Sequence, residues 1–198
     1  MFEFLFNNND ISSLLSHATE LKKKDVNRAI ETLKRAYVII AKSNTEYSID
    51  TFLRLPLYLQ EANKSNEALI EFNNLLNNGY PNEHRIKILI PMHQARIYDK
   101  LRLFWQREKQ PVKAISYGVY SILLDALGLY RQKRKEELNF IKDKAHIIDR
   151  IIPLYKKAQK LDLIDKAADL ILTELQKLPK ISTHSEIEEM VNNLLQNP

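Results

Sequence analysis

The residues best suited to chemistry lie in one aromatic and basic segment near the middle of the chain. Tyr98 and Trp105 stand seven positions apart, about two helical turns, and Arg102 and Lys109 share their flank of a helix. Aromatic rings stack on bases or peptide side chains, while Arg and Lys bind phosphate or carboxylate groups. We therefore expect a binding strip along one helix, unless its rings pack against the next helix and its cations are only solvated. The strip consists of Tyr98, Arg102, Trp105 and Lys109, and Arg85 and Arg96 on the other flank of the same helix are further expected binding residues.

A second basic cluster follows in the run Arg131–Lys135, where four of five residues are cationic. The residues that we expect to contact phosphate or an acidic partner there are Arg131, Lys133 and Arg134. The alternative is an exposed helix end whose charges are solvated. This run lies beside the first strip only if the helices stack tightly.

One histidine has carboxylates at metal-ligand spacing. Asp143, His146 and Asp149 follow one another at intervals of about one helical turn, an arrangement found in metal sites of helix bundles. Those sites need the motif twice, together with carboxylates from other helices, and this chain holds it once. We therefore expect a structural role for these residues, and neither a metal nor another cofactor.

The chain contains none of the common catalytic motifs. It has no phosphate-binding glycine loop, no H-E-x-x-H and no G-x-S-x-G. It also has no cysteine, which excludes thiol nucleophiles, thiolate zinc sites, iron–sulfur clusters and disulfides. We therefore expect a protein that is not an enzyme.

The net charge of +5 is concentrated in the middle of the chain. Residues 67–135 carry 12 Lys and Arg against 6 Asp and Glu, a balance of +6, whereas residues 1–66 carry +1 and residues 136–198 carry −2. An anionic partner is therefore attracted first to the central part of the chain.

The composition also favours a location and an origin. The apolar start of the chain is too short for a signal peptide and is followed by asparagines, and no run approaches the ~20 apolar residues of a membrane span. We therefore expect a cytoplasmic protein without membrane contact. Asn, Ile and Lys are plentiful, with 20 Lys against 10 Arg, which is typical of a bacterial or phage protein from an AT-rich genome.

Apolar residues recur at helical spacing through nearly the whole chain, and no stretch alternates as a strand does. Together with polar caps and prolines, this pattern predicts an all-α fold of about eight or nine helices. The expected ranges are 11–23, 26 onwards, 46–62, 65–78, 83–108, 111–128, 136–160, 163–178 and 183 onwards.

A short phrase repeats along these helices: a small residue follows a polar turn and opens a helix, and larger apolar residues follow one turn later. The opening residues are Ala29, Ala68, Ala114 and Ala167. With a proline after the last turn, at Pro81 and Pro179, the phrase resembles the tetratricopeptide repeat, although that family's first-helix signature (Trp, Leu-Gly, Tyr) is not intact here. The resemblance implies antiparallel helical hairpins, stacked into an α-solenoid that holds partners.

Two other architectures stay open. Prolines fall inside the first helix of three pairs, at Pro56, Pro91 and Pro153, as in HEAT-type repeats, whose first helix bends at proline. The opening residues are also spaced irregularly, by 39, 46 and 53 residues, which leaves a compact irregular bundle as the alternative.

We therefore expect a single α-helical domain over residues 1–198, with an extension at 1–10 and a capping helix at 183–198. Its expected function is that of a scaffold, a non-catalytic protein–protein interaction module that binds an acidic peptide or helix of a partner in a basic groove. The alternative is a nucleic-acid-binding regulatory protein that uses the central basic region. The terminal helix either caps the stack or pairs two copies into a homodimer.

Overall fold

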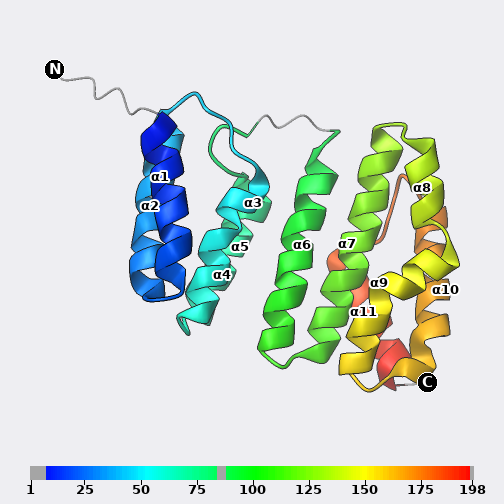
Figure 1. The fold of residues 1–198 in the computed structure, drawn as a ribbon. Helices are drawn as coiled ribbons and strands as arrows, with labels where there is room; N and C mark the ends of the chain where they lie inside the picture. Colours follow the sequence, from blue (N-terminus) through cyan, green and yellow to red (C-terminus); the bar gives the residue numbers. More distant parts are fainter. Residues whose placement is uncertain (1–7, 84–87, 197–198) are drawn as a thin grey trace. The chain divides into compact units, whose positions relative to one another are not determined.

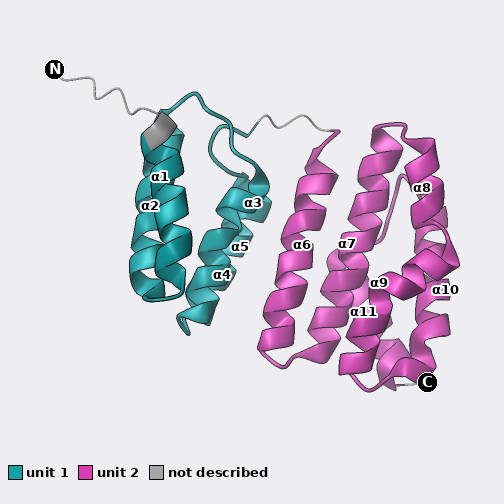
Figure 2. Cartoon of the chain, viewed as in Figure 1, with its two compact units in different colours: residues 1–84 teal, residues 85–198 magenta. Residues whose placement is uncertain are grey.

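The computed structural model describes residues 8–83 and 88–196, and helices account for most of them (Figure 1). Over these residues no segment forms a β-strand, which confirms the all-α class. The chain divides into two compact units, residues 1–84 and residues 85–198, and each is described by itself (Figure 2). The single domain expected from the chain length stays a prediction.

The N-terminal unit is made of helical pairs. Its helices are α1 (Asn8–Lys22), α2 (Val26–Lys42), α3 (Ile49–Phe52), α4 (Arg54–Glu61) and α5 (Ser65–Asn78). α1 packs against α2, α2 against α4, and α4 against α5. The Asp25 carboxylate accepts a hydrogen bond from the Arg28 N–H at 3.1 Å, which confirms the expected N-cap of α2. Residues 1–7 of the expected extension lie outside the described residues.

The single helix expected over residues 46–62 is wrong, because the structure has α3 and α4 there, which meet at Leu53. Pro56 favours the break, since proline has no N–H to donate and costs a hydrogen bond in a helix interior, a cost that α9 accepts at Pro153. α4 begins at Arg54 and so places Pro56 in that first turn.

The end of α2 is held by a side chain from far along the chain. The Asn82 amide nitrogen donates to the backbone carbonyls of Ile40, Ser43 and Thr45 at distances of 2.8, 2.9 and 2.9 Å. The Ile40 carbonyl lies in the last turn of α2, where it also accepts from the Ser43 N–H at 3.0 Å, and the other two carbonyls lie at and beyond the end of the helix. Asn82 therefore satisfies the backbone between α2 and α3.

The C-terminal unit is built around one central helix, α7. Its elements are α6 (Ile90–Arg107), α7 (Pro111–Arg131), α8 (Lys135–Ile141), α9 (Lys144–Lys157), a 3-10 turn (Leu161–Leu163), α10 (Ile164–Gln176) and α11 (His184–Gln196). α7 packs against α6, α8, α9, α10 and α11, and its buried residues occur all round the helix. The unit is thus arranged around α7, and a linear stack of hairpins stays a prediction.

Two glycines let neighbouring helices approach α7 closely. A Cβ atom at Gly128 would lie 2.5 Å from Cγ of Met92 on α6, and one at Gly118 would lie 2.6 Å from Cδ1 of Leu154 on α9. Both distances are shorter than real Cβ contacts, so a larger residue would displace its neighbour. Packing therefore requires small residues on α7 where it meets α6 and α9.

In length and apolar composition, α7 resembles a membrane-spanning helix more than we expected from the sequence pattern. Among the described helices, α7 alone is long and apolar enough to cross a bilayer, judged by length and composition. However, 72% of its apolar window is buried inside the structure, as in the core helix of a globular protein. The cellular location stays a prediction.

Two other expected helices have different bounds. The helix expected over residues 83–108 begins at Ile90, because Pro91 occupies the first turn of α6, and residues 84–87 lie outside the described part of the chain. The helix expected over residues 136–160 is interrupted where α8 ends and α9 begins. There the Asp143 carboxylate accepts a hydrogen bond from the His146 N–H at 3.1 Å and caps α9.

The expected C-terminal helix is present as α11, and it packs against α7. Its buried residues are Ile187 and Val191. The sequence Thr183-x-x-Glu186 forms a capping box at the start of this helix: the Thr183 N–H donates to the Glu186 carboxylate at 2.6 Å. The start of α11 was therefore readable from the sequence.

Four helices of the described chain end in the same turn. In each turn a non-glycine residue has a left-handed backbone, with φ between 56° and 60°, and the N–H after it donates to the carbonyl five positions earlier at 2.9 to 3.0 Å. This hydrogen bond defines the Schellman motif. The left-handed residues are Asn63, Lys109, Lys133 and Gln159.

We expect the substitution Gln159→Gly to stabilise the protein. A Cβ atom costs about 1–2 kcal/mol in the left-handed region, and glycine removes this cost. Part of the gain is lost because glycine also makes the unfolded chain more flexible, which favours the unfolded state. The free energy of unfolding should rise by about 0.5–1 kcal/mol, measured by urea unfolding. Gln159→Ala keeps the Cβ atom, and an equal gain in that control would contradict the explanation by strain.

Candidate functional site

The predicted α6 strip contains Arg102, which is already paired inside its own unit. The Arg102 guanidinium donates to Oδ1 of Asp99 from Nε at 2.9 Å and from Nη2 at 2.7 Å, and Lys100 Nζ lies 3.4 Å from Oδ2. Burial raises the pKa of Asp99, but the hydrogen bonds and charge of Arg102 outweigh it, so the pKa is lowered overall. A carboxylate from outside would have to compete with Asp99 for Arg102.

Trp105 is half-buried among contacts of the same unit. Its ring meets that of Phe104 edge-on, with 5.1 Å between the centroids, and lies 6.2 Å from the ring of Tyr117. The Lys113 ammonium lies 4.2 Å from the Trp105 ring centroid, a cation–π contact. One face of the ring that we expected to stack on a ligand is therefore occupied by Lys113.

Tyr98 belongs to an aromatic cluster that the sequence did not reveal. The aromatic cluster consists of Tyr98 on α6, Tyr117 and Tyr120 on α7, and His184 on α11. The centroid of the His184 ring lies 4.1 Å from that of Tyr117 and 5.4 Å from that of Tyr120. Burial, with smaller contributions from Tyr120 and Tyr117, raises the pKa of Tyr98 to about 12. The cluster docks α11 on α6 and α7.

The predicted cations are spread along the antiparallel pair α6 and α7. Lys109 lies in the turn between α6 and α7, and Arg131 ends α7, a helix of 21 residues. At 1.5 Å per residue these two cations lie roughly 30 Å apart along the helix. Arg96 and Lys109 are exposed, and Arg85 lies outside the described residues. Lys109 and the cations at the end of α7 therefore do not form one continuous surface.

The cations after α7 line a pocket of about 420 Å³, which we call the α7–α8 pocket. Three predicted residues, Arg131, Lys133 and Arg134, are among those that line it. Lys135, the last residue of the predicted basic run, also lines it. The sequence pattern did not single out the apolar and aromatic lining residues, although an aromatic residue directly before a basic run was a usable signal. These residues are Leu129, Tyr130 and Leu138.

The turn between α7 and α8 places these charges. Lys133 has the left-handed backbone, and the Arg134 N–H donates to the Leu129 carbonyl at 3.0 Å, so the chain reverses within a few residues. The Arg134 guanidinium donates to Oε1 of Glu137 from Nη2 at 2.6 Å and from Nε at 2.9 Å. The pKa of Glu137 is lowered by a hydrogen bond to its own backbone and by the bond from Arg134. Arg134 therefore carries an internal counterion.

The candidate metal ligands have structural contacts. Asp143 caps α9, and the His146 ring lies 4.1 Å from the ring centroid of Phe140. Within residues 8–83 and 88–196, no group of three His, Asp or Glu side chains is placed to hold a metal ion. Together these contacts favour the structural role expected for Asp143 and His146.

His184 lies in a largely apolar setting at the start of α11. Its Nε2 atom is buried and has no hydrogen-bond partner among the described residues. Burial lowers the pKa of His184, and the nearby Glu188 opposes this effect without cancelling it. The folded protein therefore favours the neutral imidazole, which packs between tyrosine rings.

We expect acidification to weaken the folded C-terminal unit through His184. Because the pKa of His184 is lower in the folded chain than its ordinary value of 6.5, the unfolded chain binds a proton first as the pH falls. The free energy of unfolding should therefore decrease as the pH falls below 6.5. Urea unfolding above and below that pH should show that the free energy of unfolding decreases less for His184→Phe than for the unchanged chain. His17→Phe alters an exposed histidine and should behave like the unchanged chain; if both variants lose the same amount, His184 is not the cause.

Comparison with known proteins identifies no family. The sequence matches no family model, and neither a curated protein nor a solved structure matches it significantly. The resemblance to tetratricopeptide repeats stays a prediction, and the function has to be inferred from the side chains of the two units.

Proposed function

We propose that this chain is a non-catalytic protein-interaction module, and that its α7–α8 pocket binds an acidic segment of a partner protein. The observation that carries the proposal is the composition of the pocket, in which apolar side chains lie beside four cationic ones. Such a site suits a peptide that presents an apolar side chain next to Asp or Glu.

The apolar part of the pocket offers an anchor point. Leu129 and Leu138 are nearly buried, whereas Tyr130 keeps 44% of its surface exposed. Tyr is among the residue types that contribute most to the binding energy of protein interfaces. With a volume of about 420 Å³, the pocket accommodates a few side chains of a partner.

The cationic rim has charge available for a partner. Lys133 and Lys135 are exposed, and neither has an ion-pair partner among the described residues, whereas Arg134 is paired with Glu137. An incoming carboxylate therefore meets two lysines that no internal carboxylate neutralises. Opposite charges of this kind mainly speed association and select the partner.

A nucleic acid is the alternative partner, and the pocket supports it less well. Single-stranded nucleic acids are bound along grooves with several stacking rings, whereas Tyr130 is the aromatic residue among those that line this pocket. Of the cations on and after α6, Lys100 and Arg102 contact Asp99, whereas Arg96 and Lys109 are exposed. The combination of apolar side chains with one lining aromatic ring in the α7–α8 pocket favours an acidic peptide.

Reversing the two lysines should weaken binding. A labelled synthetic peptide with one Leu flanked by glutamates serves as the probe, followed by fluorescence anisotropy. We expect Lys133→Glu combined with Lys135→Glu to raise the Kd about tenfold or more, because two attractive contacts become repulsive.

The matched control for this pair is Lys156→Glu with Lys166→Glu. Both lysines are exposed in the same unit and lie outside the pocket, so the net charge changes equally. Equal losses in both pairs, or no binding to the unchanged chain, would contradict the proposal. A single-stranded oligonucleotide that binds more tightly than the peptide, with steep salt dependence, would favour the alternative.

Removing the exposed ring tests the apolar anchor. We expect Tyr130→Ala to weaken the same peptide about 5- to 30-fold, as truncation of an aromatic anchor does. Phe140→Ala is the control, because Phe140 is 61% exposed in the same unit and does not line the pocket. If Phe140→Ala costs as much as Tyr130→Ala, the anchor lies elsewhere.

A further inference from the structure

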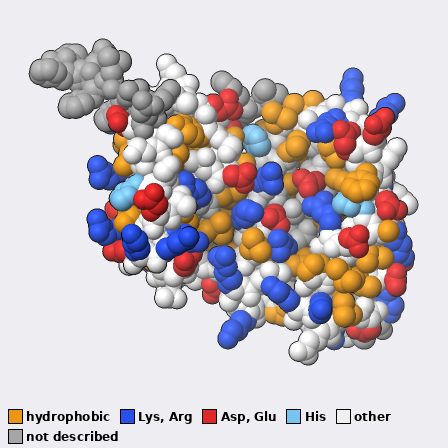
Figure 3. Space-filling view, viewed as in Figure 1, with side chains coloured by type: hydrophobic (Ala, Val, Ile, Leu, Met, Phe, Trp, Pro, Cys, Tyr) orange, Lys and Arg blue, Asp and Glu red, His pale blue; other side chains and the backbone are white. Residues whose placement is uncertain are grey.

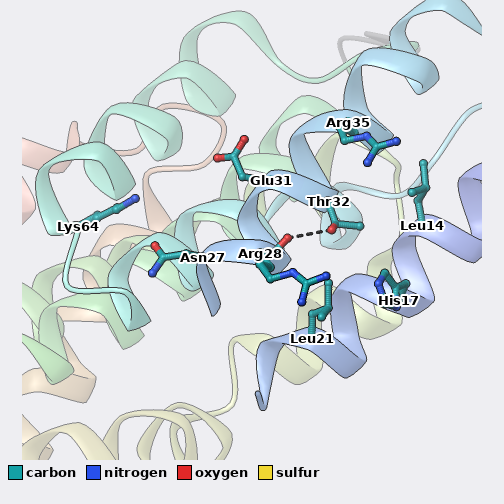
Figure 4. Close-up of a pocket in the computed structure, with 9 residues that line it drawn as sticks. All are labelled: Leu14, His17, Leu21, Asn27, Arg28, Glu31, Thr32, Arg35 and Lys64. Atoms are coloured by element: carbon teal, nitrogen blue, oxygen red, sulfur yellow. Dashed lines mark hydrogen bonds between the residues drawn. The ribbon is translucent and has the colours of Figure 1, made fainter. Parts of the chain in front are cut away.

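The N-terminal unit carries a pocket of its own on the α1–α2 hairpin, with a volume of about 370 Å³ (Figure 4). Two rows of side chains line much of it. α1 provides Leu14, His17 and Leu21, and α2 provides Arg28, Thr32 and Arg35. We call this the α1–α2 pocket.

The two rows repeat with the same period. Leu14 and Leu21 are seven residues apart on α1, and Arg28 and Arg35 are seven residues apart on α2. This spacing corresponds to roughly 10 Å along each helix. Figure 4 shows Leu14 near Arg35 and Leu21 near Arg28, as an antiparallel hairpin requires. Each end of the pocket therefore combines one leucine with one guanidinium.

The middle of the pocket has fewer free polar groups than its ends. Thr32 is only 8% exposed, and its hydroxyl donates to the Arg28 carbonyl at 2.8 Å, the bond drawn as a dashed line in Figure 4. His17 lies 3.9 Å from the Glu20 carboxylate. The polar contacts available to a ligand therefore come from the two arginines at the ends and from exposed Asn27 and Lys64, which also line the pocket.

The pocket also carries an excess of positive charge. Arg28 and Arg35 are exposed, and neither has an ion-pair partner among the described residues. The carboxylate that lines the pocket, Glu31, lies 3.5 Å from Lys34 Nζ and is neutralised there. In Figure 3, Lys and Arg side chains gather over the end of this hairpin that holds the α1–α2 turn. The charge is complementary to an acidic ligand.

We infer that the α1–α2 pocket docks an acidic amphipathic helix of a partner protein. The helix repeats an apolar residue next to a Glu or Asp every seven residues, because that spacing returns a side chain to the same face of a helix. Its apolar residues pack on Leu14 and Leu21, and its carboxylates pair with Arg28 and Arg35. This inference uses other residues than the α7–α8 pocket and does not rest on it.

The test uses a labelled synthetic helix of three heptads, with Leu and Glu each repeated every seven residues, titrated into the full chain. Anisotropy should report a Kd about tenfold weaker for Arg28→Ala combined with Arg35→Ala. Lys24→Ala with Lys42→Ala removes the same charge from exposed positions of the same hairpin outside the pocket, and should change the Kd by less than about twofold. Circular dichroism checks that both pairs remain helical.

Three further measurements separate this inference from its rivals. A reordered probe that keeps the composition but loses the seven-residue spacing should bind more weakly than the heptad probe. The pair Lys133→Glu and Lys135→Glu should leave the Kd of the heptad probe unchanged, which makes failure here distinguishable from failure of the α7–α8 pocket. The inference is overturned by an undetectable affinity of the unchanged chain, by equal losses in the two alanine pairs, or by equal binding of the reordered probe. It is also overturned if a single-stranded oligonucleotide binds more tightly through Arg28 and Arg35.

Discussion

The burial of α7 on all sides is the constraint on which the C-terminal unit depends. α6, α8, α9, α10 and α11 each cover part of this helix, and Gly118 and Gly128 keep two of the contacts short. The Ser121 hydroxyl donates to the Ala95 carbonyl at 3.0 Å, so a buried polar group between α6 and α7 is also satisfied. A helix covered in this way has no free face for a ligand. A partner of this unit has to bind at an end of α7 or on the outer helices, and the α7–α8 pocket lies at such an end.

The docking of α11 uses the side-chain types that also recognise partners. The His184 ring packs against Tyr98, Tyr117 and Tyr120. Close by, the Lys113 ammonium lies over the Trp105 ring, and the Asp99 carboxylate forms an ion pair with Arg102. An aromatic and basic strip in a sequence therefore has two explanations, an open binding surface or the seat of another helix of the same chain. In this structure Tyr98, Trp105 and Arg102 contact residues of their own unit, whereas Lys133 and Lys135 after α7 have no ion-pair partner among the described residues.

The sequence was sufficient wherever the deciding interaction is local. Asp25 and the Thr183–Glu186 pair cap helices within one turn, and the apolar residues Ile97, Leu101 and Phe104, which recur at helical spacing, are buried on one face of α6. It was insufficient where two local signals compete, as at Asp143, where an N-cap interrupts a stretch with continuous helical periodicity. Contacts between residues far apart in the chain could not be predicted. Spacing along α6 predicts that Tyr98 and Trp105 share a flank, and both rings do contact Tyr117. The same spacing does not predict that His184 of α11 packs on Tyr98.

Each pocket contains a cation in the first turn of a helix, a position at which negative charge is stabilising. Lys135 is the first residue of α8, and Arg28 lies in the first turn of α2, positions at which the helix dipole disfavours positive charge by about 0.3–1 kcal/mol. Arg131, in the last turn of α7, needs no such explanation, because the dipole favours a cation there. Stability alone would place acidic residues at these helix starts, as α8 does with Glu136 and Glu137. A bound carboxylate would offset the cost at Lys135 and Arg28. Removing either charge should therefore act in opposite directions on folding and on partner binding, a combination that a purely structural role does not produce.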